Sequence, residues 1–280
     1  METELLSIPS KIFIVPYRNR PQHKFFFCKH ISFLMETESD YEIYIVHQSD
    51  DRPFNRGAIK NIGFIAMRDK YRANDAYKNI TFVFNDIDTV PFTKLFNYNT
   101  EHGVVKHFYG FTYALGGIVS ITGADFERIN GFPSLWGWGR EDNELQARCH
   151  AHHISIDRSH FYKIGSPEIL QLFDGMTRII QKKKGIFTKQ TRPSPRDGLQ
   201  TITQLLYSVD TKSTNMKDNI FVWFHPHILY INVLSFETYN KISDYEFHDY
   251  DLRETRQVFA NPKKISNKVN IQPQDWNASV

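Results

Sequence analysis

The sequence places two pairs of neighbouring carboxylates where they could serve chemistry. The first pair, Asp86 and Asp88, lies in the tetrapeptide NDID at the end of an apolar run. If this run is a strand, alternation points both acids to one side and Ile87 to the core. Two such acids suit a hard cation that is held together with nucleotide phosphates. Acids at a strand end also cap loops, so metal binding and capping both remain open for this motif.

The second pair, Glu141 and Asp142, follows two tryptophans and two glycines in LWGWGREDNEL. Gly137 and Gly139 permit unusual backbone angles, so Trp138 between them could move with the loop. The acids fall at the predicted start of a helix, where the helix dipole favours negative charge. An ionised Asp142 is usable as a general base towards a sugar hydroxyl. The alternative is an ordinary pair of helix N-terminal acids beside a core tryptophan.

Arginines follow the first two predicted strands. The motif PYRNR supplies Arg18 and Arg20, and PFNRG supplies Phe54 and Arg56. Guanidinium groups are well suited to phosphate or nucleobase contacts, and an aromatic ring beside an arginine could stack on a base. Two alternatives remain open: surface arginines in the first motif, and a hydrophobic staple with a helix cap in the second.

The elements that must position these side chains follow from the hydrophobic pattern. About the first 90 residues alternate short β-branched or aromatic runs with segments of helical periodicity. This order predicts an α/β fold with a mostly parallel sheet, in which ligands bind at the carboxyl ends of the strands. PYRNR and NDID both lie at such ends. We expect strands from Lys11, from Tyr41 and from Ile80 through NDIDTVP, separated by helices over Phe26–Leu34 and Lys60–Tyr71.

The remainder of the chain is less regular, and neither an internal repeat nor a clear linker is evident. The expected elements are a strand over Ile118–Ile121, a helix from about Ala124, a helix over Arg140–His150, a solvated loop or frayed helix over Asp174–Asp197, strands in NIFVWF and HILYINVLSF, and a polar tail after Asn261.

Composition narrows the class of protein. The 280 residues carry a formal net charge of +3, which is near balance and gives no reason to expect nucleic-acid binding. No apolar run of about 18 residues predicts a membrane span, and the N-terminus shows no signal pattern. The two cysteines, Cys28 and Cys149, indicate no disulfide framework, and Cys28 is expected to be a buried thiol. We therefore expect a soluble, cytoplasmic protein.

Three histidines in HAHHIS, namely His150, His152 and His153, raise the question of a metal site. No cysteine or acid at ligand spacing accompanies them, so a solvated helix end is the preferred interpretation. The phosphate-binding GxxxxGK loop, the Rossmann glycine triplet and the GxSxG nucleophile elbow are all absent from the sequence.

The motifs PYRNR, FNRG, FNDID and GG–INGF–WGWGRED occur in one order along the chain. In that order they resemble the β-1,4-galactosyltransferase family, from Lys11 to Asp210. WGWGRED is similar to the branch that adds galactose to xylose. The resemblance implies a GT-A nucleotide-sugar glycosyltransferase fold in which the acidic strand end holds Mn²⁺, or Mg²⁺, together with a UDP-sugar. It also implies that the segment over Asp174–Asp197 is a lid that orders on donor binding and excludes water.

By position, the resemblance implies a role for each motif residue. Asp142 is expected to be the catalytic base and Asp88 the metal ligand. Glu141, Asn143 and Trp138 are expected at the acceptor, although Asn143 replaces an aspartate of the family and leaves the acceptor open. The expected UDP site is lined by Pro16, Tyr17, Arg18, Arg20, Phe54, Arg56, Asp86, Gly117 and Trp138.

The departures from the family pattern carry information as well. Gln171 and Phe173 stand where the family has metal-ligand histidines, so metal affinity is expected to be weaker unless Gln171, Glu168 or Asp174 substitutes. Ala114 stands where a tyrosine of the family crowds the C2 substituent of the donor sugar. A small residue there predicts room for an N-acetyl group.

Residues 1–210 are predicted to form the catalytic domain, and residues 211–280 an extension of the same domain with a polar tail. The expected activity is inverting transfer of a galactose-like hexose, or an N-acetylhexosamine, from a UDP-sugar to a glycan or glycoside hydroxyl with a β-linkage. The usual family members are disulfide-bonded and membrane-anchored, whereas this chain is expected to be cytoplasmic and viral or microbial. Two alternatives remain: a degenerate nucleotide-sugar or glycan-binding protein without turnover, and a nucleotidyltransferase.

Overall fold

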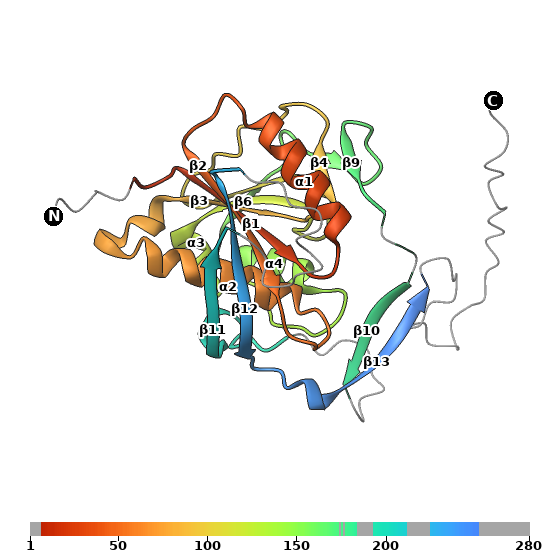
Figure 1. Ribbon diagram of the computed structural model, residues 1–280. Helices are drawn as coiled ribbons and strands as arrows, with labels where there is room; N and C mark the ends of the chain where they lie inside the picture. Colours follow the sequence, from red (N-terminus) through yellow and green to blue (C-terminus); the bar gives the residue numbers. More distant parts are fainter. Residues whose placement is uncertain (1–6, 174, 176, 184–192, 212–224, 252–280) are drawn as a thin grey trace, which may run out of the picture.

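The computed structural model describes residues 7–173, 175, 177–183, 193–211 and 225–251, and it confirms the predicted α/β class (Figure 1). A mixed sheet with a parallel centre runs through the molecule. Its strands are β1 (Lys11–Tyr17), β2 (Tyr41–Gln48), β3 (Thr81–Asn85), β5 (Val104–Gly110), β6 (Ile118–Thr122), β7 (Ser155–Asp157), β8 (Tyr162–Lys163), β11 (Thr203–Asp210) and β12 (Ile228–Glu237). The order across the sheet is β11-β12-β2-β1-β3-β6-β5-β7, and β8 pairs with β5. Two small ribbons pair β4 (Thr89–Pro91) with β9 (Ile169–Gln171) and β10 (Thr177–Lys183) with β13 (Tyr245–Asp251).

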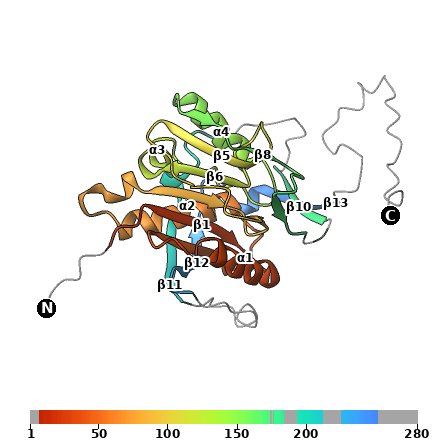
Figure 2. The same ribbon diagram turned by 90° about the horizontal axis from the view of Figure 1, so that it is seen from above.

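The helices cover both faces of this sheet, which is why its central strands are apolar throughout. Along β1, Ile12 and Ile14 belong to one core cluster while Phe13 and Val15 belong to the other. A strand that is buried on both faces loses the polar–apolar alternation of a surface strand. Figure 2 shows α1 and α4 on opposite sides of the strands. The helices are α1 (Pro21–Leu34), α2 (Arg56–Lys70), α3 (Gly123–Arg128) and α4 (Glu141–Ala151), with 3-10 turns at Ala73–Asn79, Leu199–Thr201 and Ile242–Asp244.

The parallel pairing brings the polar motifs to one edge of the sheet, as predicted. β1 runs parallel to both β2 and β3, so the three strands end on the same side. PYRNR ends the first strand, PFNRG follows the second, and NDID follows the third. Because these ends are adjacent, residues far apart in the sequence share one edge.

The expected strand from Ile80 through NDIDTVP is wrong in part. β3 ends at Asn85, and Ile87 and Asp88 form a turn before β4 begins. The side-chain amide of Asn85 donates to the carbonyls of Asp86 and Thr89, both at 2.8 Å, and thereby closes the turn. Strand alternation therefore does not orient the two acids, although Ile87 is buried as expected.

The segment over Asp174–Asp197, expected as a loop or frayed helix, contains the strand β10, which pairs antiparallel with β13. The sequence of β10, TRIIQKK, is rich in β-branched residues, which favour strands. The charged residues around it suggested a loop because the partner strand is distant in the sequence. Part of the segment, the run NIFVWF and the tail after Asn261 lie outside the described residues.

The chain after residue 210 contributes to the central sheet through β12, the strand predicted in HILYINVLSF, which pairs parallel with β2. It also supports the tryptophan-rich segment. The indole of Trp136 stacks on Phe236 with ring centroids 5.6 Å apart, and its Nε1 donates to the carbonyl of Asn240 at 2.9 Å. Residue 210 is the last residue of β11, and the division into a catalytic part and an extension of the same domain stays a prediction.

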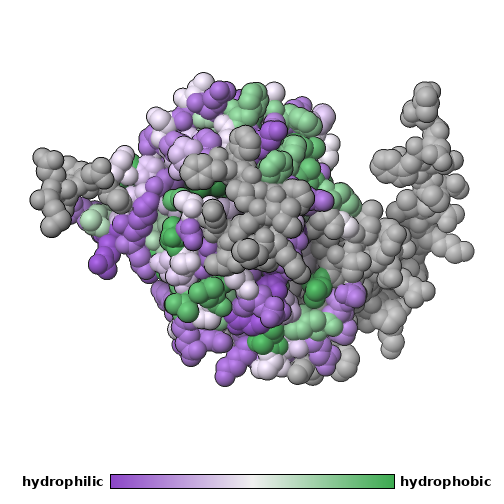
Figure 3. Space-filling model, viewed as in Figure 1, coloured by the Kyte–Doolittle hydropathy of each residue, from purple (hydrophilic) through white to green (hydrophobic). Residues whose placement is uncertain are grey.

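Figure 3 shows the part of one face that grey atoms leave visible. Hydrophilic and hydrophobic side chains alternate in small groups there. Among the described residues, no helix combines the length and apolar character that crossing a membrane requires.

Candidate active site

An ordered turn after β2 sets the start of α2 and the direction of its first side chains. Asn55 caps this helix: its side-chain oxygen accepts from the amide of Ala58 at 3.0 Å, and its own amide donates to Gln48 Oε1 at 2.9 Å. The helix therefore starts at Arg56, before the predicted Lys60, and the helix-cap alternative for this motif is confirmed. Arg56 and Lys60 are four residues apart and project from the same face of α2.

The helix α4 begins one residue after the predicted position. Arg140, at its N-terminal boundary, has a left-handed backbone with φ 75°, and Gly139 before it has φ 111°. This tight reversal places Glu141 and Asp142 in the first turn, where the helix dipole stabilises negative charge. The predicted helix is confirmed with its start shifted by one residue, and the acid pair lies in its first turn as expected.

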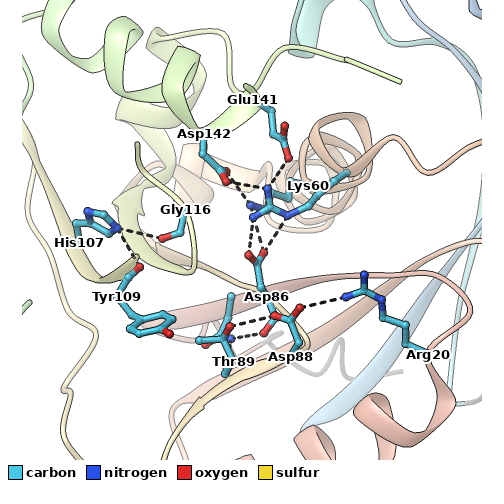
Figure 4. A network of polar contacts seen from close by, with 12 residues as sticks. Arg20, Lys60, Asp86, Asp88, Thr89, His107, Tyr109, Gly116, Glu141 and Asp142 are labelled. Atoms are coloured by element: carbon cyan, nitrogen blue, oxygen red, sulfur yellow. Dashed lines mark hydrogen bonds and ion pairs between the residues drawn. The ribbon is translucent and has the colours of Figure 1, made fainter. Parts of the chain in front are cut away.

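The guanidinium of Arg56 joins three carboxylates that come from distant parts of the chain. It donates two hydrogen bonds to Asp86, from Nε to Oδ1 at 3.1 Å and from Nη2 to Oδ2 at 2.5 Å. Its Nη1 donates to Glu141 Oε1 at 2.5 Å and to Asp142 Oδ2 at 2.8 Å. Figure 4 shows Asp86, Glu141 and Asp142 converging on this point. The motifs FNRG, NDID and WGWGRED thus form one cluster.

A second cation, Lys60, completes this cluster and was missed by the sequence analysis. Its Nζ lies 3.4 Å from Asp142 Oδ1 and 3.5 Å from Asp86 Oδ1. It also lies 4.6 Å from the ring centroid of Phe132. The side chain is only 2% exposed. Figure 4 shows it next to Asp142 and Asp86. The signal for it was available: a lysine four residues after Arg56 on an otherwise apolar helix face must be paired if it is buried.

The charges and burial within the cluster shift the pKa values of Asp86 and Glu141 in opposite directions. Burial alone raises the pKa of Asp86, but Arg56 and Lys60 outweigh it and lower that pKa to about 2. For Glu141, burial dominates over the attraction of Arg56, and the neighbouring Asp142 adds to it, so the pKa is raised. Burial lowers the pKa of Arg56, yet the three acids together raise it well above its ordinary value. Asp86 is therefore firmly ionised, while Glu141 resists ionisation.

Asp88 belongs to a separate site beside this cluster. Its Oδ2 accepts from Arg20 Nη1 at 3.1 Å, and Thr89 donates to its other oxygen at 3.0 Å. Burial, together with the charge of Asp86, raises the pKa of Asp88 against the pull of Arg20. Gln171 is close, because it pairs with Thr89 across the β4–β9 ribbon. Its side-chain oxygen accepts from the hydroxyl of Tyr109 at 2.9 Å.

Two glycines allow the backbone to pass close to these acids. A Cβ on Gly116 would meet Asp142 Oδ2 at 2.5 Å, so only glycine leaves room for this carboxylate. Gly117 has φ 72° and its carbonyl accepts from the amide of Asp86 at 3.0 Å. His107 buttresses the same loop through its Nε2, which lies 3.0 Å from the carbonyls of Gly116 and Tyr109 (Figure 4). His107 and Tyr109 were not identified from the sequence.

The other expected UDP residues lie further from the acid cluster. Tyr17 is fully buried in the core and Pro16 is buried beside it, so neither side chain is open to solvent. Arg18 pairs with Asp50 at 3.5 Å, and burial lowers its pKa. Phe54 is half-buried, and its carbonyl accepts from Gly137.

The expected acceptor residues lie on α4 and in the loop before it. Trp138 is 54% exposed, and its amide donates to the carbonyl of Ile179 in β10 at 2.8 Å. Asn143 is exposed and its side chain donates to the carbonyl of Tyr113 at 3.1 Å. Ala114, expected beside the donor sugar, is buried. The roles of all these residues in binding stay predictions.

The residues set aside by the sequence analysis fall where expected. His150, His152 and His153 are exposed around the end of α4, at a solvated helix end. Cys28 and Cys149 are free and buried, and burial raises the pKa of both thiols to about 12. Within the described ranges, no three His, Cys, Asp or Glu side chains come together as a metal site.

Two family models match consecutive parts of the chain. The N-terminal region of glycosyl transferase group 7 matches residues 6–101, and the N-terminal domain of galactosyltransferase matches residues 103–171. Among curated relatives, mouse β-1,4-galactosyltransferase 4 is 29% identical over 212 residues, which cover 70% of this chain. Rat β-1,4-galactosyltransferase 6 is 34% identical over 158 residues, or 52% of this chain. The matches span 59% of the mouse protein and 39% of the rat protein, so the chain corresponds to part of each relative.

Solved structures show the same architecture. A complex of Drosophila β-1,4-galactosyltransferase 7 with manganese, UDP-Gal and xylobiose superimposes with a TM-score of 0.62 at 17% identity. The superposition covers 81% of this chain and 94% of the Drosophila chain. This confirms the predicted GT-A fold. The two family models together match more than half of the sequence, and the residues of the acid cluster lie within them. The chain therefore belongs to the glycosyl transferase group 7 family.

Proposed function

We propose that this chain is an inverting, UDP-sugar-dependent glycosyltransferase. It transfers a galactose-like hexose, or an N-acetylhexosamine, to a glycan or glycoside hydroxyl with a β-linkage. The observation that supports this best is the convergence of Asp142 with Arg56 and Asp86 at the carboxyl ends of the parallel strands. The named activities of the galactosyltransferase relatives support the same reaction class.

In this reaction Asp142 acts as the general base. Its carboxylate takes the proton of the acceptor hydroxyl, and the acceptor oxygen forms a bond to the anomeric carbon of the donor. The bond from that carbon to the diphosphate breaks on the opposite side, and UDP leaves with the electron pair. Because the acceptor oxygen and the diphosphate occupy opposite faces of that carbon, its configuration inverts. Glu141 and Asn143, next to the base on α4, are the residues proposed to hold the acceptor.

A divalent cation fits the Asp88 end of the site by its ligand chemistry. Asp88, in the turn before β4, and Gln171, on the paired strand β9, offer carboxylate and amide oxygens, as Mn²⁺ or Mg²⁺ accepts. Burial and the neighbouring Asp86 raise the pKa of Asp88 against the pull of Arg20, so added positive charge would stabilise its ionised form. When bound, the metal would stabilise the charge of the departing diphosphate. With so few protein ligands, phosphate oxygens of the donor are needed to complete its coordination.

The same side of the site has a role in donor binding. Arg20, at the start of α1, lies beside Asp88 and supplies the positive charge nearest to the proposed diphosphate position. Trp138 and the β10 backbone, joined by a hydrogen bond, lie on segments proposed to close over the donor and exclude water. Cytoplasmic location and viral origin stay predictions.

The test is UDP release from a panel of UDP-sugars, with and without Mn²⁺, using xylose, glucose and N-acetylglucosamine as acceptors. We expect turnover of one donor that depends on the metal and on an acceptor. Use of an N-acetylhexosamine donor would support the consequence drawn from Ala114. UDP binding without any turnover across the panel would favour the degenerate binding protein, for which the replacement of histidines by Gln171 and Phe173 is the main argument. Absence of UDP binding would reject both.

A further inference from the structure

Lys60 points its charge into the protein, which is unusual for a lysine. Lysine side chains normally extend so that the ammonium reaches water. Lys60 is 1% exposed, and its Nζ lies between Asp142 Oδ1 at 3.4 Å, Asp86 Oδ1 at 3.5 Å and the face of Phe132. A buried ammonium is costly unless it is well paired, so this side chain must gain its stability from the acid cluster.

The two oxygens of Asp142 are held by different cations. Arg56 donates to Oδ2 at 2.8 Å, and Lys60 donates to Oδ1 at 3.4 Å. Behind the carboxylate, Gly116 leaves no space for even a Cβ. Because Arg56 and Lys60 stand one turn apart on the rigid helix α2, they fix the orientation of the carboxylate plane as well as its position.

The charge count of the cluster shows why one cation is insufficient. The groups that face Asp142 are Arg56 and Lys60 from α2, Asp86 after β3, and Glu141 from α4. His107 on β5 adds no charge near neutral pH, because burial lowers its pKa to about 4. Without Lys60, the buried Glu141 and the half-buried Asp86 and Asp142 would share Arg56 alone. Arg56 is also expected to contact the donor. Lys60 has no expected role at the donor, so its charge serves to balance the acids of the cluster.

We propose that Lys60 is a positioning residue for sugar transfer, which holds one oxygen of Asp142 so that the carboxylate meets the acceptor hydroxyl in a fixed orientation. The inference rests on the proposed function, in which Asp142 is the base. Packing alone does not account for the residue. Ile59 and Ile62 of the same helix already fill the core, and an apolar side chain at position 60 would suit Phe132 without the cost of a buried charge.

The test compares three variants of the full chain in the UDP-release assay. Lys60→Met removes the charge and keeps an unbranched side chain. Because a misplaced catalytic group loses rate without losing donor contacts, we expect kcat to fall about 30-fold, while KM for the donor and Kd for UDP stay within about threefold. Lys60→Arg should recover part of kcat. Lys70→Met is the matched control on the same helix, where Lys70 pairs with Glu42 at 2.7 Å away from the site, and it should leave kcat unchanged.

A folded Lys60→Met protein with kcat within about threefold of the wild type would overturn the proposal, since positioning errors of this kind cost more. A second measurement needs no turnover. The shift in urea midpoint caused by Lys60→Met should be smaller in an Asp142→Asn background, because the partner charge is already gone. Equal shifts in both backgrounds would show that the two residues do not interact. Wild-type turnover, measured first, tests the proposed function separately.

Discussion

The two acidic sites at the end of the sheet differ in how their charge is balanced. Asp86, Glu141 and Asp142 are held by two buried cations, Arg56 and Lys60. Asp88 pairs with Arg20 at 3.1 Å and accepts a hydrogen bond from Thr89, and its pKa is raised by burial and by Asp86. In the first site two cations already hold Asp142, which suits a base that must be positioned before the acceptor arrives. The second site needs further positive charge, which suits a metal that arrives with the donor.

The largest effect is expected from a substitution that removes Asp88 from the second site. Asp88→Ala should remove metal-dependent donor binding and lower kcat/KM by about 100-fold or more, because the carboxylate ligand is lost. Calorimetric titration of UDP with and without Mn²⁺ checks this directly. Asp69→Ala, at an exposed acid of α2, is the control and should behave as the wild type. Unchanged donor affinity and unchanged metal dependence in Asp88→Ala would remove Asp88 from the metal site.

A change to the first site should act on rate and leave the donor bound. In Gly116→Ala the new Cβ would overlap Asp142 Oδ2 and displace the carboxylate, so kcat should fall about 10- to 100-fold. Stability should change little, because a carboxylate end can move more easily than backbone. The control is Gly103→Ala, where φ is 79° and open space surrounds the Cβ position, which should cost stability and spare kcat. A Gly116→Ala protein with wild-type kcat would mean that the position of the Asp142 carboxylate does not matter for the rate.

The second site should also be improvable. Gln171→His restores an imidazole ligand where the family pattern has one, and we expect the Mn²⁺ concentration for half-maximal activity to fall about tenfold. Gln171→Leu keeps the side-chain size but removes the oxygen and should raise that concentration. Identical metal titrations for the three proteins would place the ion elsewhere.

The smallest expected effect concerns the loop that supports the first site. Burial, followed by Arg158, lowers the pKa of His107 to about 4, against an ordinary value of 6.5. The unfolded chain therefore takes up a proton as the pH falls through about 6.5, whereas the folded protein does not until about 4, so stability declines over that window and levels off below it. His107 should contribute about 2 kcal/mol of lost stability between pH 7 and pH 5. Urea unfolding of His107→Gln should show a loss of unfolding free energy between pH 7 and pH 5 that is smaller by this amount than in the wild type. In the control His150→Gln, at an exposed position, the dependence of the unfolding free energy on pH should match that of the wild type.

The comparison also shows which features the sequence could predict. The patterns KIFIVPY and YEIYIVHQ predicted β1 and β2 correctly because a strand buried on both faces is apolar throughout. The carboxyl-end rule then located the polar motifs. The pairing of Arg56 with Glu141 and Asp142 was not predictable, because it joins residues 85 and 86 positions apart through the folded chain.

Other errors have local causes. Starting the second helix at Lys60 instead of Arg56 hid the four-residue spacing that puts both cations on one face. The pairing of β10 with β13 depends on residues far apart in the chain, so local composition favoured a loop. Tyr17 lies on a strand that is covered on both faces, and its ring centroid lies 5.2 Å from that of His47, so its expected role at the donor stays a prediction.

The most direct test of this account is the turnover number of Asp142→Asn, measured with the donor that the wild type uses. Asparagine keeps the shape of the side chain but cannot take the acceptor proton. We expect kcat to fall by about 10³-fold while Kd for UDP stays within about threefold, because the donor site is left intact. Turnover within about tenfold of the wild type, in protein shown to be folded, would contradict the assignment of Asp142 as the base and with it the role proposed for Lys60.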